Sequence, residues 1–341
     1  MKKLKELQTR EDLALYLTIP LQKLTYILYK SKPDSYYDTF EIPKKNGESR
    51  QIHAPSGDLK QLQKKLAQRL WDVYREFIEE NEIQDNISHA FQKGKSIITN
   101  ANIHRNKRYV LNLDLKDFFD HFHFGRVRGF FMKNKNFELP VEIATMIAQL
   151  TCYEGKLPQG APTSPIITNL VCNILDMRLL KIAKKYRVVY TRYADDMTFS
   201  TNDKKFLENQ ENFMKSIKKE IESFGFEIND KKTRLLFCDS RQEVTGLVVN
   251  KKISVNREYC KRTRAMADAF YRRGIFEICG EEGSVNQLEG RFSFINQIDC
   301  YNNKNDREQK HTFWTLNARE RQYQKFAKIY PTVKDLFTEL L

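Results

Sequence analysis

The chain has 341 residues, of which 40% are hydrophobic and 30% charged, and it carries 58 Lys plus Arg against 44 Asp plus Glu. This composition excludes a globally disordered chain, and no apolar stretch approaches the roughly 18 residues that a membrane-spanning helix needs. The net charge of +14 favours a polyanionic partner, nucleic acid ahead of an acidic membrane surface. The basic N-terminus lacks the apolar core of a signal peptide, so we expect a cytoplasmic protein without a membrane partner.

The N-terminal third predicts a β-hairpin followed by a helix. In FEIPKKNGESRQIHAP, residues 40–55, a Lys-Lys-Asn-Gly centre separates two β-prone runs. Cations therefore lie at or near the hairpin tip, namely Lys44, Lys45 and Arg50. From Leu59 to Phe77, apolar residues recur at steps of three and four, which predicts an amphipathic helix.

The middle of the chain predicts strands that end in carboxylates. KRYVLNLDLKDFF, from Lys107, alternates as a half-buried strand with Asp114 at its end. Residues 163–186 predict a helix that Thr163 or Ser164 caps. VVYTRYADDMTFSTN then predicts two short strands joined by a turn around Ala194 and Asp195.

The C-terminal third predicts a second hairpin and basic helices. RQEVTGLVVNKKISVN, residues 241–256, is the hairpin, and residues 256–273 form a helix with six basic and two acidic side chains. The rest is mixed helical, with loops expected at Gly280, Gly283 and Gly290.

Asp114, Asp195 and Asp196 are carboxylates at strand ends in apolar surroundings, where an ionised group is costly unless it is paired or bound to a metal. Taken singly, each fits ordinary turn or cap chemistry. Brought together by a sheet, they would bind Mg²⁺, and two ions about 3.5 to 4 Å apart would support an in-line phosphoryl displacement.

Other chemistries fit the sequence poorly. Around LPQGAPTSP, residues 157–165, Ala161 and Pro162 replace the Lys and Ser/Thr of a P-loop. The six cysteines form no CxxC pair, and His121 with His123 lacks the further ligands of a zinc site. A glycosidase-like hydrolase is excluded because Asp195 and Asp196 are adjacent and cannot straddle a scissile bond.

The motifs LNLDLKDFF, LPQGAPTSP and YADD, in this order, resemble those of reverse transcriptases. Two further strings are similar to bacterial retron reverse transcriptases: NANIH at residues 100–104 fits the NAxxH pattern, and VTG at residues 244–246 fits the second retron signature. The resemblance implies an α+β fold, a right-hand polymerase with fingers, a palm of antiparallel sheet plus helices, and a helical thumb. We expect fingers at 1–107, palm at 108–121, a fingers and palm return at 122–162, palm at 163–250 and an RNA- and duplex-binding thumb at 251–341.

The resemblance also implies roles for the acidic and basic residues of the palm. Asp114 and Asp195 correspond to the metal-binding pair and Asp196 to a more peripheral carboxylate, with the Leu115 carbonyl completing the metal shell. GFEINDKKTR supplies a proton donor to pyrophosphate, for which Lys232 is preferred over Lys231.

For the incoming nucleotide, Phe119 matches the aromatic steric gate, and Gln159 with Gly160 belongs to the nucleotide segment. Lys45 with Arg50 would contact the triphosphate, although Lys44 competes with Lys45 for this role. Tyr193 would contact the primer end.

For RNA, the retron signatures would take part in RNA-specific recognition or in RNA-proximal support, the alternative being structural corners, since Asn and Gly are frequent at turns. The signatures comprise Asn100, His104, Val244, Thr245 and Gly246. The basic helix of the thumb would follow the phosphates of the template–product duplex, the alternative being a solvated charged face. Its candidate residues are Arg257, Lys261, Arg264 and Arg272.

The implied activity is RNA-templated DNA synthesis from dNTPs with two Mg²⁺ ions per site, Mn²⁺ being a substitute. Retron enzymes use a cognate non-coding RNA as template and the 2′-OH of a guanosine in that RNA as primer, so that branched RNA–DNA (msDNA) forms. A separately encoded effector and a role in bacterial anti-phage defence are expected. One alternative is a group II intron-like reverse transcriptase, although we expect no maturase or endonuclease extension here. The other alternative is an inert RNA-binding scaffold.

Overall fold

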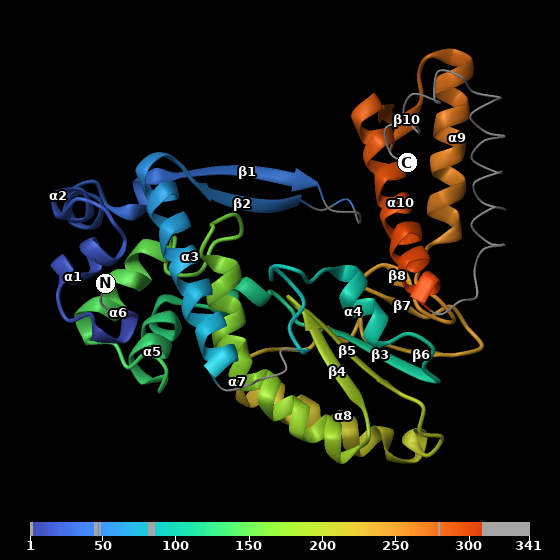
Figure 1. Cartoon of the computed structure of the whole chain (residues 1–341), viewed down its shortest axis with the longest axis horizontal. Coiled ribbons are helices and arrows are strands. Elements are labelled where there is room, and N and C mark those ends of the chain that lie inside the picture. The colour runs from blue at the N-terminus through green and yellow to red at the C-terminus, as the bar shows by residue number, and fades with distance from the viewer. Residues whose placement is uncertain (1–2, 44–46, 48, 81–85, 279, 309–341) are drawn as a thin grey trace. The chain divides into compact units, whose positions relative to one another are not determined.

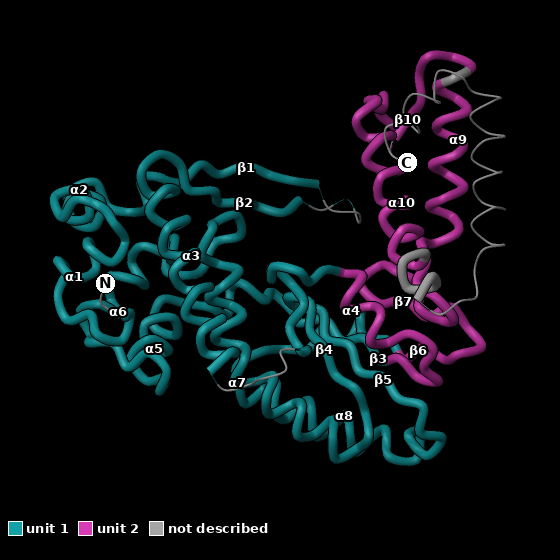
Figure 2. The backbone as a smooth tube through the Cα atoms, in the orientation of Figure 1, with its two compact units in different colours: residues 1–96, 111–234 teal, residues 97–110, 235–341 magenta. Residues whose placement is uncertain are grey.

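The computed structural model describes residues 3–43, 47, 49–80, 86–278 and 280–308, shown in Figure 1. The chain divides into two compact units, coloured separately in Figure 2. Unit 1 comprises residues 1–96 and 111–234, and unit 2 comprises residues 97–110 and 235–341. Both units are therefore discontinuous in sequence, and the predicted boundaries of fingers, palm and thumb stay predictions.

The N-terminal part of unit 1 is mainly helical, with one hairpin. Its elements are η1 (Leu4–Glu6), α1 (Arg10–Tyr16), α2 (Leu21–Thr25), η2 (Tyr26–Ser31), η3 (Pro33–Tyr36), β1 (Tyr37–Pro43), β2 (Ser49–Pro55) and α3 (Gly57–Glu80). Strands β1 and β2 pair antiparallel with Pro43 opposite Ser49, which confirms the predicted hairpin. Helix α3 confirms the apolar stripe, because Leu59, Leu62, Leu66 and Leu70 are all buried.

A four-stranded sheet in the order β4-β5-β3-β6 carries the carboxylates. The elements in this part of the chain are β3 (Tyr109–Asp114), η4 (Phe118–His121), α5 (Phe124–Lys133), α6 (Val141–Thr151), α7 (Ser164–Lys185), β4 (Val189–Tyr193), β5 (Asp196–Thr201), α8 (Phe206–Ser223) and β6 (Arg234–Phe237). Strand β3 is buried on both faces except at Asn112, so the prediction of a half-buried strand was wrong. Helix α7 is buried around most of its circumference, as expected of a central helix.

The predicted cap of α7 was also wrong. Thr163 stands at the N-cap, but its side chain makes no capping hydrogen bond, and the Ser164 hydroxyl donates instead to the Pro158 carbonyl at 2.7 Å. Ser164 thus bonds to the preceding loop, and neither hydroxyl caps the helix.

Unit 2 combines small sheets with helices. Its elements are α4 (Ile97–Ile103), β7 (Glu243–Val244), β8 (Leu247–Val248), β9 (Ser254–Val255), α9 (Arg257–Arg273), β10 (Glu277–Ile278), β11 (Glu281–Glu282) and α10 (Val285–Glu308). The predicted second hairpin is present as β7 and β8, and β9 extends it to three strands. Gly290 lies inside α10, so the loop predicted there was wrong. These mixed helices and antiparallel sheets confirm the α+β class.

Candidate active site

Asp114 ends strand β3 with only 7% of the residue exposed. Lys232 Nζ lies 2.9 Å from both carboxylate oxygens, and Asn229 Nδ2 donates to Oδ1 at 3.3 Å. The Asn229 amide also donates to the Asp114 main-chain carbonyl at 2.8 Å. These contacts matter because a buried carboxylate without partners is costly.

Asp195 and Asp196 lie at the turn between β4 and β5. In the strand register Tyr193 is opposite Asp196, which leaves Ala194 and Asp195 as the turn residues. The Leu115 amide, directly after β3, donates to the Asp195 carbonyl at 3.1 Å. The structure therefore brings Asp114 and Asp195 to the same end of the sheet.

The carboxylates at this end of the sheet repel one another. Burial raises the pKa of Asp195, and the charge of Asp114 raises it further, whereas a main-chain hydrogen bond to the carboxylate lowers it. Burial and the charges of Asp195 and Asp114 raise the pKa of Asp196 to about 7. The Asp196 residue reaches the surface, so solvent moderates this repulsion. A cation between the carboxylates would relieve the repulsion.

The donors fit a hard divalent cation. Asp114, Asp195 and the Leu115 carbonyl offer oxygen atoms, the ligands that Mg²⁺ prefers. Over the described ranges, no group of three His, Cys, Asp or Glu side chains is arranged to hold a metal ion. Of the three carboxylates predicted to bind metal, Asp114 and Asp195 line the cleft and Asp196 does not. The ammonium group of Lys232 already places one positive charge against the Asp114 carboxylate.

A cleft of about 750 Å³ opens over these carboxylates, within unit 1. It brings together much of the predicted site, since its lining includes Arg50, Asp114, Leu115, Phe119, Gln159, Asp195 and Lys232. Gly160 and Asp196 are each next in sequence to a lining residue, and Tyr193 lies two residues before Asp195, but none of the three lines the cleft. Lys44 and Lys45 lie outside the described residues.

The hairpin is attached to the predicted nucleotide segment. The His53 amide on β2 donates to the Gln159 carbonyl at 2.8 Å. Gly160 has a φ of +121°, and a Cβ there would lie 2.8 Å from Ile52 Cγ2 and 2.9 Å from the His53 carbonyl oxygen. Gly160 is therefore required for the close approach of two backbone segments.

Phe119 lies at the edge of an aromatic cluster. Its ring contacts Phe118 edge to face at 5.4 Å, and Phe118 stacks on Phe226 at 5.6 Å. The preceding Asp117 has a φ of +44°, which turns the chain sharply after β3. This packing supports the Phe119 ring where it lines the cleft.

The sequence analysis missed Arg192, which is fully buried on β4 and pairs with the buried Asp176 of α7. An arginine in the β-prone run directly before YADD was the available signal. It was overlooked because buried arginines are rare without a partner, and the partner is distant in sequence.

The retron signatures pack together in the core of unit 2. Asn100 and His104, on or just after α4, and Val244 on β7 are 1%, 0% and 1% exposed. Val244 belongs to a cluster with Ile98 and Leu247. Thr245 and Gly246 form the turn between β7 and β8, with φ values of +46° and +80°, and the Thr245 hydroxyl donates to the Ile97 carbonyl at 3.3 Å. Whether these residues contact RNA stays a prediction.

The predicted basic residues of α9 are all exposed. Arg257, Lys261 and Arg264 follow one another at steps of four and three, so they share one helix face. Arg272 is further along and pairs with Asp268 at 3.1 Å. We call Arg257, Lys261 and Arg264 the α9 stripe.

His123 caps helix α5, since its Nδ1 accepts the Arg126 amide hydrogen at 3.1 Å. His121 contacts Phe226 edge to face. His123 therefore stabilises the start of α5, and His121 packs in the aromatic cluster. Within the described ranges, no helix combines the length and apolar character needed to cross a membrane.

Most of the chain matches one known protein family. The family described as "Reverse transcriptase (RNA-dependent DNA polymerase)" matches residues 42–262, more than half of the chain.

Curated relatives narrow this similarity. The chain is 33% identical to Retron Ec86 reverse transcriptase of Escherichia coli, in a match covering 84% of each protein. It is 32% identical to Retron Mx162 reverse transcriptase and 34% identical to Retron Mx65 reverse transcriptase, both of Myxococcus xanthus. Those matches cover 87% and 76% of this chain but only 65% and 62% of the relatives.

Among solved structures, the chain is similar to telomerase from Candida albicans in complex with a TWJ fragment of telomeric RNA. The TM-score is 0.47 at 13% identity, with 84% of this chain and 58% of the telomerase chain covered.

Proposed function

The chain belongs to the retron reverse transcriptases, a family of RNA-directed DNA polymerases with a right-hand fold, and on this premise we propose that it copies a cognate non-coding RNA into DNA with Mg²⁺. The observation that carries the proposal is the meeting of Asp114 and Asp195 in one cleft with Arg50, Phe119 and Gln159. Carboxylates can hold the metal ions of nucleotidyl transfer, a cation can bind the triphosphate, and an aromatic ring and an amide can contact the nucleoside.

Asp114, Asp195 and the Leu115 carbonyl would hold two Mg²⁺ ions, or Mn²⁺ as a substitute, with Asp196 at their periphery. When bound, the ions would lower the pKa of the primer hydroxyl and offset charge on the leaving pyrophosphate. Lys232, whose Nζ lies 2.9 Å from Asp114, would give pyrophosphate a proton. The contribution of the protein is mainly positioning and electrostatic stabilisation.

The remaining cleft residues would select and orient the nucleotide. Arg50, with Lys45, would bind the triphosphate, and Gln159 with Gly160 would lie against the nucleoside. The Phe119 ring would occupy the space of a ribose 2′-OH and so favour dNTPs. Tyr193, at the end of β4, would support the primer terminus.

Unit 2 would serve the RNA. The exposed α9 stripe suits phosphate contacts with the template–product duplex, together with Arg272. Asn100, His104 and Val244 would support this surface from the core, while Thr245 and Gly246 would reach the RNA. As the resemblance to retron reverse transcriptases implies, the primer would be a guanosine 2′-OH in the cognate RNA and the product would be msDNA. The role would be cytoplasmic anti-phage defence with a separate effector.

Co-purification followed by a synthesis assay tests the proposal. The RNA bound to the protein would be sequenced, transcribed in vitro and returned to nucleic-acid-free protein with dNTPs and Mg²⁺. We expect DNA attached to that RNA through a 2′,5′ linkage, which a debranching enzyme cleaves. The Asp195→Asn and Asp196→Asn double variant serves as the control and should yield no DNA.

The same assay separates the alternatives. Extension of an annealed DNA primer without any RNA-linked product would favour a group II intron-like enzyme. Tight RNA binding without synthesis from either primer would favour an inert scaffold and contradict the proposal.

A further inference from the structure

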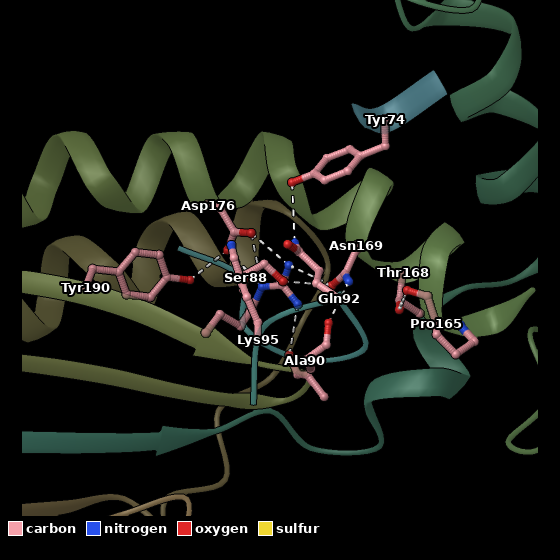
Figure 3. A network of polar contacts seen from close by, with 12 residues as sticks. Tyr74, Ser88, Ala90, Gln92, Lys95, Pro165, Thr168, Asn169, Asp176 and Tyr190 are labelled. Carbon is pink, nitrogen blue, oxygen red and sulfur yellow. Dashed lines mark hydrogen bonds and ion pairs between the residues drawn. The ribbon is translucent and has the colours of Figure 1, made fainter. Parts of the chain in front are cut away.

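Arg192 is the largest fully buried side chain in the described part of the protein, and its charge is matched by Asp176. Arg192 Nε donates to Asp176 Oδ1 at 2.8 Å, and Nη2 donates to Oδ2 at 2.8 Å. The Tyr190 hydroxyl donates to the same Oδ1 at 2.8 Å. Figure 3 shows Asp176 and Tyr190 pointing toward each other between helix α7 and the strands. The pair is bidentate and geometrically rigid.

The remaining nitrogen of the guanidinium, Nη1, contacts the turn between β4 and β5 that carries Asp195. Arg192 Nη1 donates to the Ala194 carbonyl at 3.1 Å, one residue before Asp195. Ala194 has a φ of +56°, a left-handed conformation that costs energy for a residue with a Cβ. On its other side the turn is held by the Leu115 amide, which donates to the Asp195 carbonyl. The strained turn is thus fixed at two consecutive carbonyls.

The network also anchors the strand that carries the turn. The Arg192 amide donates to the Ile87 carbonyl at 2.8 Å, and the His89 amide donates to the Arg192 carbonyl at 2.9 Å. Asn169 of α7 accepts from the Ser88 hydroxyl at 3.0 Å and donates to the Ala90 carbonyl at 3.0 Å, as Figure 3 shows. Helix α7 and residues 87–90 therefore form a rigid frame around β4.

We infer that Arg192 and Asp176 are positioning residues for the reaction: their buried pair fixes the Ala194 carbonyl and so holds Asp195 where it and Asp114 can share a metal ion. This inference rests on the proposed function. It predicts that loss of the pair weakens metal binding and slows the chemical step, beyond any effect on folding.

Two variants separate positioning from stability. Arg192→Lys keeps the charge, but an ammonium group cannot bridge Asp176 and the Ala194 carbonyl as a planar fork does. The triple variant Arg192→Met, Asp176→Leu and Tyr190→Phe removes both charges and the hydroxyl together, so it leaves no unpaired buried charge, and such replacements are often tolerated. It nevertheless loses the donor to Ala194.

For both variants we expect the turnover number for primer extension to fall on the order of 100-fold, with the KM for dNTP changed less. The dissociation constant for Mn²⁺, measured by electron paramagnetic resonance without substrates, should rise roughly 10- to 100-fold. Arg178→Lys is the matched control, because Arg178 lies on α7 like Asp176 but pairs with Glu220 of α8, and it should change neither quantity. Circular dichroism sets a temperature at which each protein is folded.

A folded triple variant with wild-type turnover and Mn²⁺ affinity would overturn the inference, because the pair would then serve only stability. If the triple variant does not fold, Arg192→Lys decides by the same two readouts. Failure of the proposed function looks different: the wild-type protein itself would extend no primer, while the Mn²⁺ dissociation constants would still test the positioning role.

Discussion

The catalytic cleft of unit 1 and the retron signatures of unit 2 expose their characteristic residues very differently. In the cleft, Arg50, Phe119 and Gln159 line a space open to solvent. In unit 2, Asn100, His104 and Val244 are almost completely buried. Both regions were singled out as functional from sequence alone. A motif string can therefore line an open cleft or pack inside a core, and only the fold separates the two.

The largest difference between the two regions is expected when the carboxylates at the turn between β4 and β5 are removed. The Asp195→Ala and Asp196→Ala double variant should lose primer extension by on the order of 10³-fold or more, because the groups that hold the metal act directly on the reaction. Binding of the cognate RNA, measured by filter binding, should be unchanged. Retained extension would refute the metal assignment.

The steric gate is the next test. Phe119→Val should raise ribonucleotide incorporation relative to deoxynucleotide incorporation by roughly 10- to 100-fold, because a pocket contact of this size discriminates by about 1–3 kcal/mol. Single-nucleotide kinetics with dNTP and rNTP measure the ratio. Phe118→Leu, behind the gate, is the control and should affect stability more than selectivity. An unchanged ratio in the Phe119 variant would remove it from the gate role.

The α9 stripe tests electrostatic contact in unit 2. Replacing Arg257, Lys261 and Arg264 by Gln should weaken duplex binding and lower the slope of log affinity against log salt by about one for each lost phosphate contact. A triple Gln variant at exposed lysines of α8 gives the same change in net charge, at Lys215, Lys218 and Lys219. Equal slopes for the two variants would mean that the stripe is a solvated face.

The smallest effect on DNA synthesis is expected from substitutions in the VTG signature. There the buried Val244 and the neighbouring turn residue Thr245 should respond in opposite ways. Val244→Ala should lower the free energy of unfolding by about 2 kcal/mol through lost burial, with unchanged RNA affinity at temperatures where the protein is folded. Thr245→Asn should raise the free energy of unfolding by about 1 kcal/mol, because Asn tolerates the left-handed φ better, yet it should weaken cognate RNA binding.

Denaturation curves and RNA titrations on both proteins give the answer. If neither variant alters RNA affinity, VTG is a packing motif alone.

Periodicity predicted most of the fold because local pattern and burial agree there. The stripe of α3 follows from side-chain spacing, and the hairpin before it follows from a turn sequence between two β-prone runs. Alternation also located the strand ending at Asp114, but it predicted one exposed face where β3 is buried on both. Gly290 was misplaced because glycine lowers helix propensity only modestly, and α10 continues through it. Thr163 was misjudged as a cap because its hydroxyl is buried without a hydrogen-bond partner, and the neighbouring Ser164 hydroxyl bonds to the preceding loop.

The carboxylates could be singled out from sequence because they follow β-prone runs, and Phe119 because of the resemblance to reverse transcriptases. Arg192 could not, since its function depends on Asp176 meeting it across α7 and β4. Breaking such a buried pair costs about 3–5 kcal/mol, so it is also a structural requirement. Residues that act through others become visible only when the contacts are known.

The attachment of the hairpin to the loop beneath it has a practical consequence for directed evolution. His53 and Gln159 are linked through main-chain atoms, so a library randomised at either residue retains the link. Gly160 has no such freedom, because even one methyl group would strike β2. Searches for altered substrate preference can therefore diversify both neighbours of this contact at once, provided that the glycine is held constant.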